Sequence, residues 1–318
     1  MSADGGSRAV LAALAANTGI AVTKFIAFLL TGISSMLAEA IHSVADSGNQ
    51  LLLLLGGRQA RRQPTEQHPF GYGRERYIYA FIVSIVLFSV GGLFALYEAY
   101  HKGHELHVTH GHPEDSLLDS RWAWVPIVVL LAAIVMEALS FRTAIRETRH
   151  VKGDASYVEF IRRAKQPELP VILLEDLAAL CGLAFALFGV GLSLLTDNLW
   201  FDVIGTALIG LLLVAVAIVL GIETKSLLLG ESASAEAELR ITDALTATEG
   251  IDRVIHLKTM HLGPDELLVA AKIAVPAVDS AADVAGAIDA AESSIRRAEP
   301  TARLVYLEPD IARTPGAG

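Results

Sequence analysis

Three residues that can exchange protons or bind metals recur at helical spacing near the amino terminus: Glu39, His42 and Asp46. Residues three and four positions apart lie on one face of an α-helix, about one turn from each other. A helix through this stretch therefore aligns two carboxylates and one imidazole. Imidazole with carboxylate suits zinc, whereas carboxylates alone suit harder divalent ions. The pattern predicts a metal site; the alternative is a helix–helix hydrogen-bond network in which His42 pairs with Asp46.

A second acidic feature is the adjacent pair Glu175 and Asp176, which interrupts the apolar stretch between Pro170 and Gly182. Ionisable groups inside a membrane span are costly and indicate function. Successive residues differ by about 100° around a helix, so at most one of the two carboxylates can point fully into a shared site. Because Glu175 lies near the expected start of the helix, its carboxylate could instead reach solvent.

Other polar residues in or at the ends of the apolar stretches give weaker signals. We interpret each of them as an interhelical hydrogen bond or an anchor at the end of a span, and Lys24 and Glu98 alternatively as charges lining a pore. They are Asn17, Lys24, Asn49, Gln50, Glu98, Glu137 and Asp202.

Histidines are concentrated in one loop, which holds five of the ten in the chain. They are His101, His104, His107, His110 and His112. Clustered histidines bind divalent metals and titrate near physiological pH. The loop could therefore capture metal or sense acidity outside the membrane, and the alternative is a solvated loop with a biased composition.

The composition is that of a membrane protein. Of 318 residues, 53% are hydrophobic and 19% are charged, whereas a soluble domain carries about a quarter charged residues. The single cysteine, Cys181, excludes a disulfide framework and a cysteine-based zinc cluster. A net charge of −10 argues against nucleic acid as a partner, because phosphate binding needs a basic face.

Apolar stretches of roughly 20 residues can cross a lipid bilayer as helices, and six stretches qualify. They cover residues 8–30, 34–56, 77–100, 122–146, 170–195 and 200–222. The loops at 57–76 and 146–168 are rich in arginine and lysine, and the loop at 101–120 is acidic. The positive-inside rule therefore places both termini in the cytoplasm.

The predicted architecture is an all-α bundle of six transmembrane helices over residues 1–230, followed by a small cytoplasmic α+β domain over 231–313. The α+β domain is expected as an open-faced sandwich of order α-β-β-α-β, and residues 314–318 as a disordered tail. Its elements are predicted as helices at 233–248 and 279–298 and strands at 252–261, 266–275 and 302–308.

Taken together, these features resemble the cation diffusion facilitator family. The match rests on six spans, a His-x-x-x-Asp pair on the second, an acidic fifth span, an α+β tail, and the segments 34–43 and 68–75. The resemblance covers nearly the whole chain. The Leu-Leu-Glu-Asp run and the long loop before it most resemble the branch of this family that includes the mitochondrial zinc transporter 9 group.

The resemblance implies a homodimeric exporter of divalent cations in the cell membrane, not an enzyme, that moves zinc outward in exchange for protons. It also implies a tetrahedral site with two ligands from the second span and two from the fifth. Ile172 stands where one usual ligand should be, so His42, Asp46 and Asp176 remain. Glu175, Glu39 or a water would be the fourth ligand, and such a site would also accept Mn²⁺, Fe²⁺ or Co²⁺.

Two accessory sites of the family look degraded in this chain. His68 stands alone at the loop site, with Thr65 and Tyr72 in the other places. At the tail site the family's ligand positions read Tyr306 and Glu308, with His256 and His261 as unaligned candidates. We therefore expect the tail to dimerise mainly through packing. The rival functional reading is a membrane regulator that has lost transport, and an intramembrane protease is disfavoured because no His-Glu-x-x-His pair is present.

Overall fold

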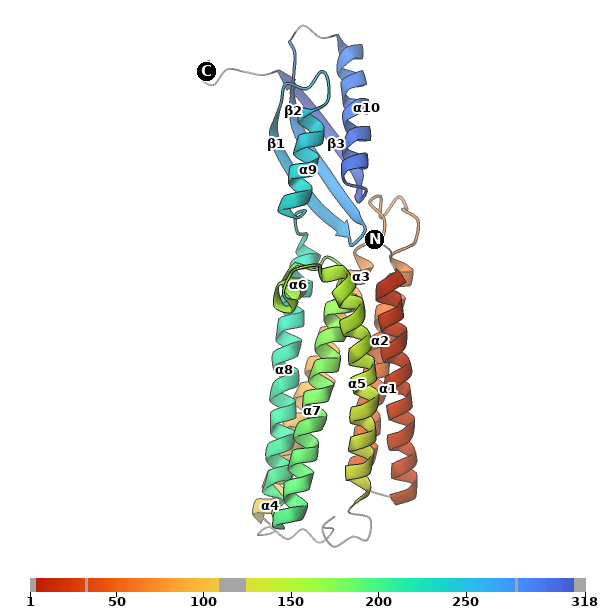
Figure 1. Ribbon diagram of the computed structural model, residues 1–318, viewed down its shortest axis with the longest axis vertical. Coiled ribbons are helices and arrows are strands. Elements are labelled where there is room, and N and C mark those ends of the chain that lie inside the picture. The colour runs from red at the N-terminus through yellow and green to blue at the C-terminus, as the bar shows by residue number, and fades with distance from the viewer. Residues whose placement is uncertain (1–3, 32–33, 109–123, 278–279, 312–318) are drawn as a thin grey trace. The chain divides into compact units, whose positions relative to one another are not determined.

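The structure is a computed structural model that describes residues 4–31, 34–108, 124–277 and 280–311 (Figure 1). Between residues 4 and 42 the structure does not describe every side chain. The side chains of Glu39 and His42 are among those outside the description. The chain divides into two compact units. The first, called here the helical unit, comprises Met1–Arg58 and Tyr77–Lys225, and the second, the sheet unit, comprises Gln59–Arg76 and Ser226–Gly318.

The helical unit is built from long helices that run side by side (Figure 1). They are α1 (Asp4–Thr31), α2 (Ser34–Gln59), α3 (Glu75–Val86), α4 (Phe94–Val108), α5 (Val125–Lys152), the short α6 (Tyr157–Arg163), α7 (Glu168–Thr196) and α8 (Trp200–Leu229). A π-helical segment, η1 (Leu87–Leu93), joins α3 to α4 without a break. Helix α5 packs against α7 and α1, which places it next to the acidic pair on α7.

Four helical segments in the described part of the chain are long and apolar enough to cross a membrane. They are Glu75–Val108, Val125–Lys152, Glu168–Thr196 and Trp200–Leu229, and they correspond to the last four predicted spans. Helices α1 and α2 coincide with the first two predicted spans but are not among the four, so the number of six spans stays a prediction.

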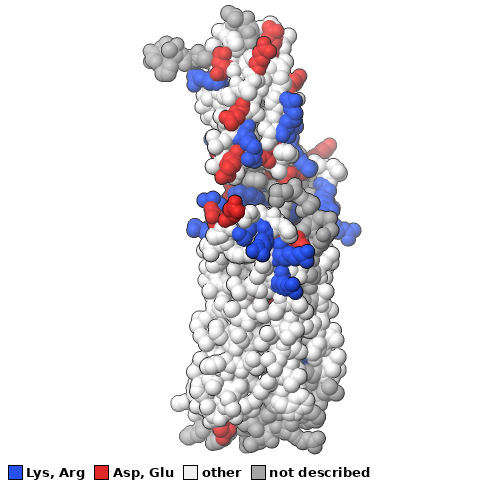
Figure 2. Space-filling model, viewed as in Figure 1, with Lys and Arg blue, Asp and Glu red and all other residues white. Residues whose placement is uncertain are grey.

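Apolar side chains cover the outside of these helices. On α8, for example, Ile204, Leu211 and Ile222 are each more than half exposed. The visible face of the helices is almost free of charge along its length (Figure 2). Because helices in lipid need no polar outer face, such a surface is stable only inside a bilayer.

Helices α7 and α8 form a tight antiparallel hairpin. Asp197 ends α7 in the left-handed conformation with φ 52°, and the side chain of Asn198 accepts a hydrogen bond of 3.0 Å from the backbone N–H of Trp200. Further along the hairpin, a methyl group at Gly205 would lie 2.9 Å from the carbonyl oxygen of Phe185. Close packing of small residues of this kind holds membrane helices together.

We expect Gly205→Ala to destabilise the helical unit by about 1–3 kcal/mol, the usual cost of overpacking. The added methyl meets backbone rather than a flexible side chain, so α7 and α8 must move apart. The melting temperature in detergent should fall by roughly 2–4 °C for each kcal/mol lost. Gly191→Ala, on α7 with open space around it, is the matched control and should not lower the melting temperature. Equal melting temperatures for the wild type and Gly205→Ala would contradict the close packing.

The sheet unit contains α9 (Ala235–Thr246), β1 (Arg253–Gly263), β2 (Glu266–Val275), α10 (Ala281–Ala298) and β3 (Ala302–Ile311), which confirms the predicted order α-β-β-α-β. Strand β2 lies in the centre, antiparallel to β1 and parallel to β3. The predicted start of the second helix near residues 279–280 is also confirmed, since Ser280 and Asp283 form a capping box. Alternate residues of β2 enter a core shared with Ile241, Leu245 and Ile295 of the two helices.

The loop after α2 belongs to the sheet unit. Arg76 forms an ion pair of 3.1 Å with Asp265 in the turn between β1 and β2, and Gly73 lies directly against Gly263, where an added methyl would clash. By its position in the chain, the sequence predicts this loop as part of the transmembrane domain. The grouping of residues 59–76 with the sheet arises from contacts that are distant in sequence.

Candidate metal centre

The two acidic residues of α7 are both buried but face different helices. Asp176 is 0% exposed and Glu175 is 4% exposed, so the expectation that Glu175 could reach solvent is wrong. The residues before them, Leu169 to Leu173, are packed into the core of the helical unit. This packing fixes the rotation of α7 and therefore where each carboxylate points.

Glu175 is held by amide side chains of α2. Asn49 Nδ2 donates to its Oε1 at 3.0 Å and Gln50 Nε2 donates to its Oε2 at 3.1 Å. Gln50 in turn accepts a hydrogen bond of 3.2 Å from Asn17 Nδ2 on α1. These contacts confirm the prediction that Asn17, Asn49 and Gln50 form hydrogen bonds between helices. Both carboxylate oxygens of Glu175 have an amide donor, so this residue links α7 to α2, and Gln50 extends the network to α1.

Asp176 faces α5 instead. Its Oδ2 accepts a hydrogen bond of 2.9 Å from Ser140 Oγ. The other oxygen, Oδ1, is buried and accepts no hydrogen bond from an N–H group or a hydroxyl group. The carboxyl group of Glu137, one helical turn before Ser140 and 3% exposed, lies within hydrogen-bonding reach of Asp176. Two carboxyl groups in contact require a proton or a cation between them.

The remaining charges of the centre come from α1 and α2. Asp46, partly buried on α2, is close enough to Glu137, Glu175 and Asp176 to interact with them electrostatically. Lys24 on α1 is buried and donates a hydrogen bond of 2.9 Å to Ser43 Oγ. The structure thus brings Asp46, Glu175 and Asp176 into one buried region of the helical unit.

The predicted ligand set is described only in part. The backbone of Glu39 and His42 lies in α2, but their side chains lie outside the described residues. Among the described side chains, no group of three or more His, Cys, Asp or Glu residues is placed to hold a metal ion. Any complete site therefore depends on side chains such as that of His42, and the site assignment remains a prediction. Ile172 is fully buried in the apolar core and serves packing.

Two residues of this centre were not predicted as site residues. Glu137 is recognisable in the sequence as a carboxylate inside an apolar stretch. From sequence alone we interpret it as a residue that forms an interhelical hydrogen bond or anchors the end of a span. Ser140 gave no signal, since serine is common in membrane helices. Only the packing of α5 on α7 brings these two residues to Asp176.

The candidate accessory histidines do not form a second centre in the described part of the chain. The rings of His68 and Tyr72 are in tilted contact, with centroids 4.8 Å apart. His101, His104 and His107 were expected in a loop, but they are exposed on the last turns of α4, which continues to Val108. His110 and His112 lie outside the described residues.

The tail positions of the sheet unit favour an ion pair over a metal. Lys272 on β2 forms ion pairs of 2.9 Å with Glu308 and 3.1 Å with Asp310, and hydrogen bonds to these two carboxylates raise the pKa of Lys272. By strand register His256 lies opposite Lys272, whose ammonium would repel a cation.

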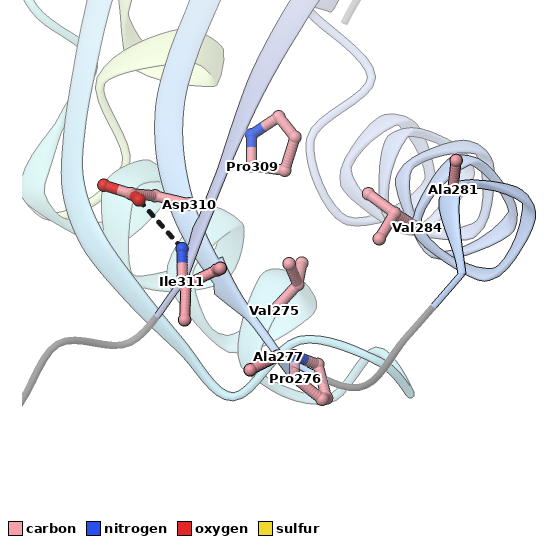
Figure 3. Close-up of a pocket in the computed structure, with 8 residues that line it drawn as sticks. All are labelled: Val275, Pro276, Ala277, Ala281, Val284, Pro309, Asp310 and Ile311. Atoms are coloured by element: carbon pink, nitrogen blue, oxygen red, sulfur yellow. Dashed lines mark hydrogen bonds between the residues drawn. The ribbon is translucent and has the colours of Figure 1, made fainter.

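At the end of the same sheet an open pocket lies between β2, β3 and the start of α10 (Figure 3). Its lining is apolar apart from Asp310, which accepts a hydrogen bond of 2.8 Å from the backbone N–H of Ile311. One carboxylate, already paired with Lys272, does not make this pocket a metal site.

Comparison with known proteins identifies the family. The model of the cation efflux transmembrane domain matches residues 10–229, so the chain belongs to the cation efflux family. It is a multi-pass membrane protein.

Two relatives are the proton-coupled zinc antiporters SLC30A9 of Xenopus laevis and Homo sapiens. The frog protein is 31% identical over 85% of this chain and 46% of its own length. The human protein is 32% identical over 81% of this chain and 44% of its own length. Metal tolerance protein C4 of Arabidopsis thaliana is 28% identical over 84% of this chain and 56% of its own length. The chain thus spans about half the length of these relatives.

Proposed function

We propose that this protein transports divalent metal cations, zinc first among them, across a membrane in exchange for protons. The observation that carries the proposal is the buried acidic centre between α2, α5 and α7, where Asp176 has an oxygen without a donor inside an apolar bundle. Ionisable residues at such a position mark ion pathways. Membership of the cation efflux family and two relatives named as zinc antiporters support the same reading.

The chemistry of the centre accounts for the coupling. Carboxylates and imidazole bind a metal only when deprotonated, so metal binding releases protons and proton binding releases metal. In this proposal His42, Asp46 and Asp176 bind the cation, and exposure of the centre to one side and then the other completes exchange. Glu39 remains a candidate ligand one turn from His42. Glu175 anchors α2 to α7, because both of its oxygens already have amide donors.

The proposal includes the arrangement of the protein in its membrane. We propose six spans in a cell membrane, with both termini on the cytoplasmic side, and residues 231–313 as a cytoplasmic domain. We also propose a homodimer, with the exposed face of the sheet around Tyr306 available for contact between two copies. Cross-linking of the reconstituted protein would test the dimer.

The test of function is flux into proteoliposomes that contain one dye for metal and one for pH. Zn²⁺, Mn²⁺, Fe²⁺, Co²⁺ and Cd²⁺ are compared, with empty liposomes and an Asp46→Ala/Asp176→Ala variant as controls. We expect zinc flux with opposite proton movement, lost in the variant. If folded wild-type protein moves none of these metals, the rival reading of a membrane regulator without transport takes the place of this proposal.

A further inference from the structure

Glu137 is a buried carboxylate that the functional site, as predicted from sequence, leaves without a role. It lies in the middle of α5 with apolar neighbours on both sides in sequence, and it is 3% exposed. An isolated carboxylate is costly to bury at such a position. A proton or a nearby cation must therefore balance its charge.

The groups around Glu137 are mainly acidic. The carboxyl of Asp176 on α7 is in hydrogen-bonding reach, and Asp46 on α2 adds further negative charge. Lys24 on α1 provides one positive charge, with its ammonium hydrogen-bonded to Ser43. Glu175 also interacts with Glu137, so four carboxylates and one ammonium leave a surplus of three negative charges when all are ionised, and a divalent cation would offset most of it.

The orientation of Asp176 provides an independent indication of a ligand. Ser140 occupies one of its oxygens, while Oδ1 is fully enclosed and has no donor. Buried polar atoms in proteins are nearly always satisfied. A carboxylate oxygen of this kind next to a second carboxyl group needs a shared proton or a bound cation. Both oxygens of the neighbouring Glu175, in contrast, already accept hydrogen bonds from Asn49 and Gln50.

We infer that Glu137 on α5 is a further ligand of the transported cation, acting with Asp176 and supplying the oxygen that Ile172 cannot supply. The inference rests on the proposed transport function and deepens it. The ion would then be held by residues of α2, α5 and α7, and the ligand set would be rich in carboxylate oxygen. Such a set binds Mn²⁺, Fe²⁺ and Co²⁺ as well as Zn²⁺.

The first part of the test is calorimetric titration of Zn²⁺ and Co²⁺ into the full chain in detergent. Glu137→Gln keeps the size of the side chain and removes its charge, and should weaken binding at least about tenfold, since even partners outside the ligand shell matter by about 10–100-fold. Glu147→Gln, the same change near the end of the same helix, is the matched control and should bind as the wild type does.

The second part distinguishes a ligand from a supporting residue. In a Cys181→Ser background, Glu137→Cys places the only thiol of the chain at this position. Added Cd²⁺ should then give a thiolate-to-metal charge-transfer band in the ultraviolet, because a coordinating thiol is deprotonated by the metal. Ala133→Cys, buried one turn away on α5, should give no such band.

The outcomes separate this inference from the proposed function. Weakened binding in Glu137→Gln together with the band in Glu137→Cys supports Glu137 as a ligand. Wild-type affinity in Glu137→Gln, or binding without a band in Glu137→Cys, overturns the inference while transport by the other residues stands. A wild-type protein that neither binds nor transports these metals overturns both.

Discussion

Replacement of Asp176 by asparagine should abolish metal transport while leaving the fold intact. The asparagine carbonyl can still accept the hydrogen bond from Ser140, and its size is nearly that of aspartate. What it lacks is the charge that attracts a cation and the second oxygen that Oδ1 supplies. We expect flux in proteoliposomes to fall at least about a hundredfold, because changes outside the ligand shell alone cost about 10–100-fold.

The matched control for this change is Asp197→Asn on the same helix. Asp197 is the exposed C-cap of α7 in the left-handed conformation, which asparagine also adopts readily. This variant should transport as the wild type does. Ser140→Ala removes only the hydrogen bond to Asp176, and its transport rate should lie between those of Asp176→Asn and Asp197→Asn. A folded Asp176→Asn protein that moves zinc at the wild-type rate would exclude Asp176 from the transport site.

The second large effect is expected for Glu175→Gln, and it is an effect on stability. In the wild type, the two oxygens of Glu175 accept hydrogen bonds from Asn49 and Gln50. Glutamine replaces one oxygen by an amino group, so two donors face each other in a buried position. Leaving a buried donor unsatisfied costs about 1–3 kcal/mol. The melting temperature in detergent should therefore fall by roughly 2–4 °C for each kcal/mol lost.

A partner substitution tests the cause of this loss. In Glu175→Gln/Asn49→Asp the carboxylate and the amide exchange places between α7 and α2, so donor again faces acceptor and part of the stability should return. Glu159→Gln breaks only a surface ion pair with Arg163 and should leave the melting temperature nearly unchanged. If Glu175→Gln instead melts like the wild type but prefers a different metal, Glu175 is a ligand, as the sequence alone suggested.

Sequence determined the features of this protein that depend on local pattern. Long apolar runs predicted the membrane helices, because no other arrangement satisfies backbone hydrogen bonds in lipid. The His-x-x-x-Asp spacing on the second stretch led to the family, and the match over residues 10–229 confirms it. In the tail, the helices and strands predicted from sequence follow the order that the sheet unit shows.

Sequence could not determine how the helices are rotated against each other. Glu175 and Asp176 are neighbours in the chain, and only the packing of Leu169 to Leu173 into the core turns the first towards Asn49 and Gln50 and the second towards Ser140. For the same reason Glu137, 39 positions before Asp176 in the chain, was interpreted as a helix contact or an anchor. A helical pattern specifies which residues share a face, but the face that meets a neighbouring helix is decided by side-chain packing across the whole bundle.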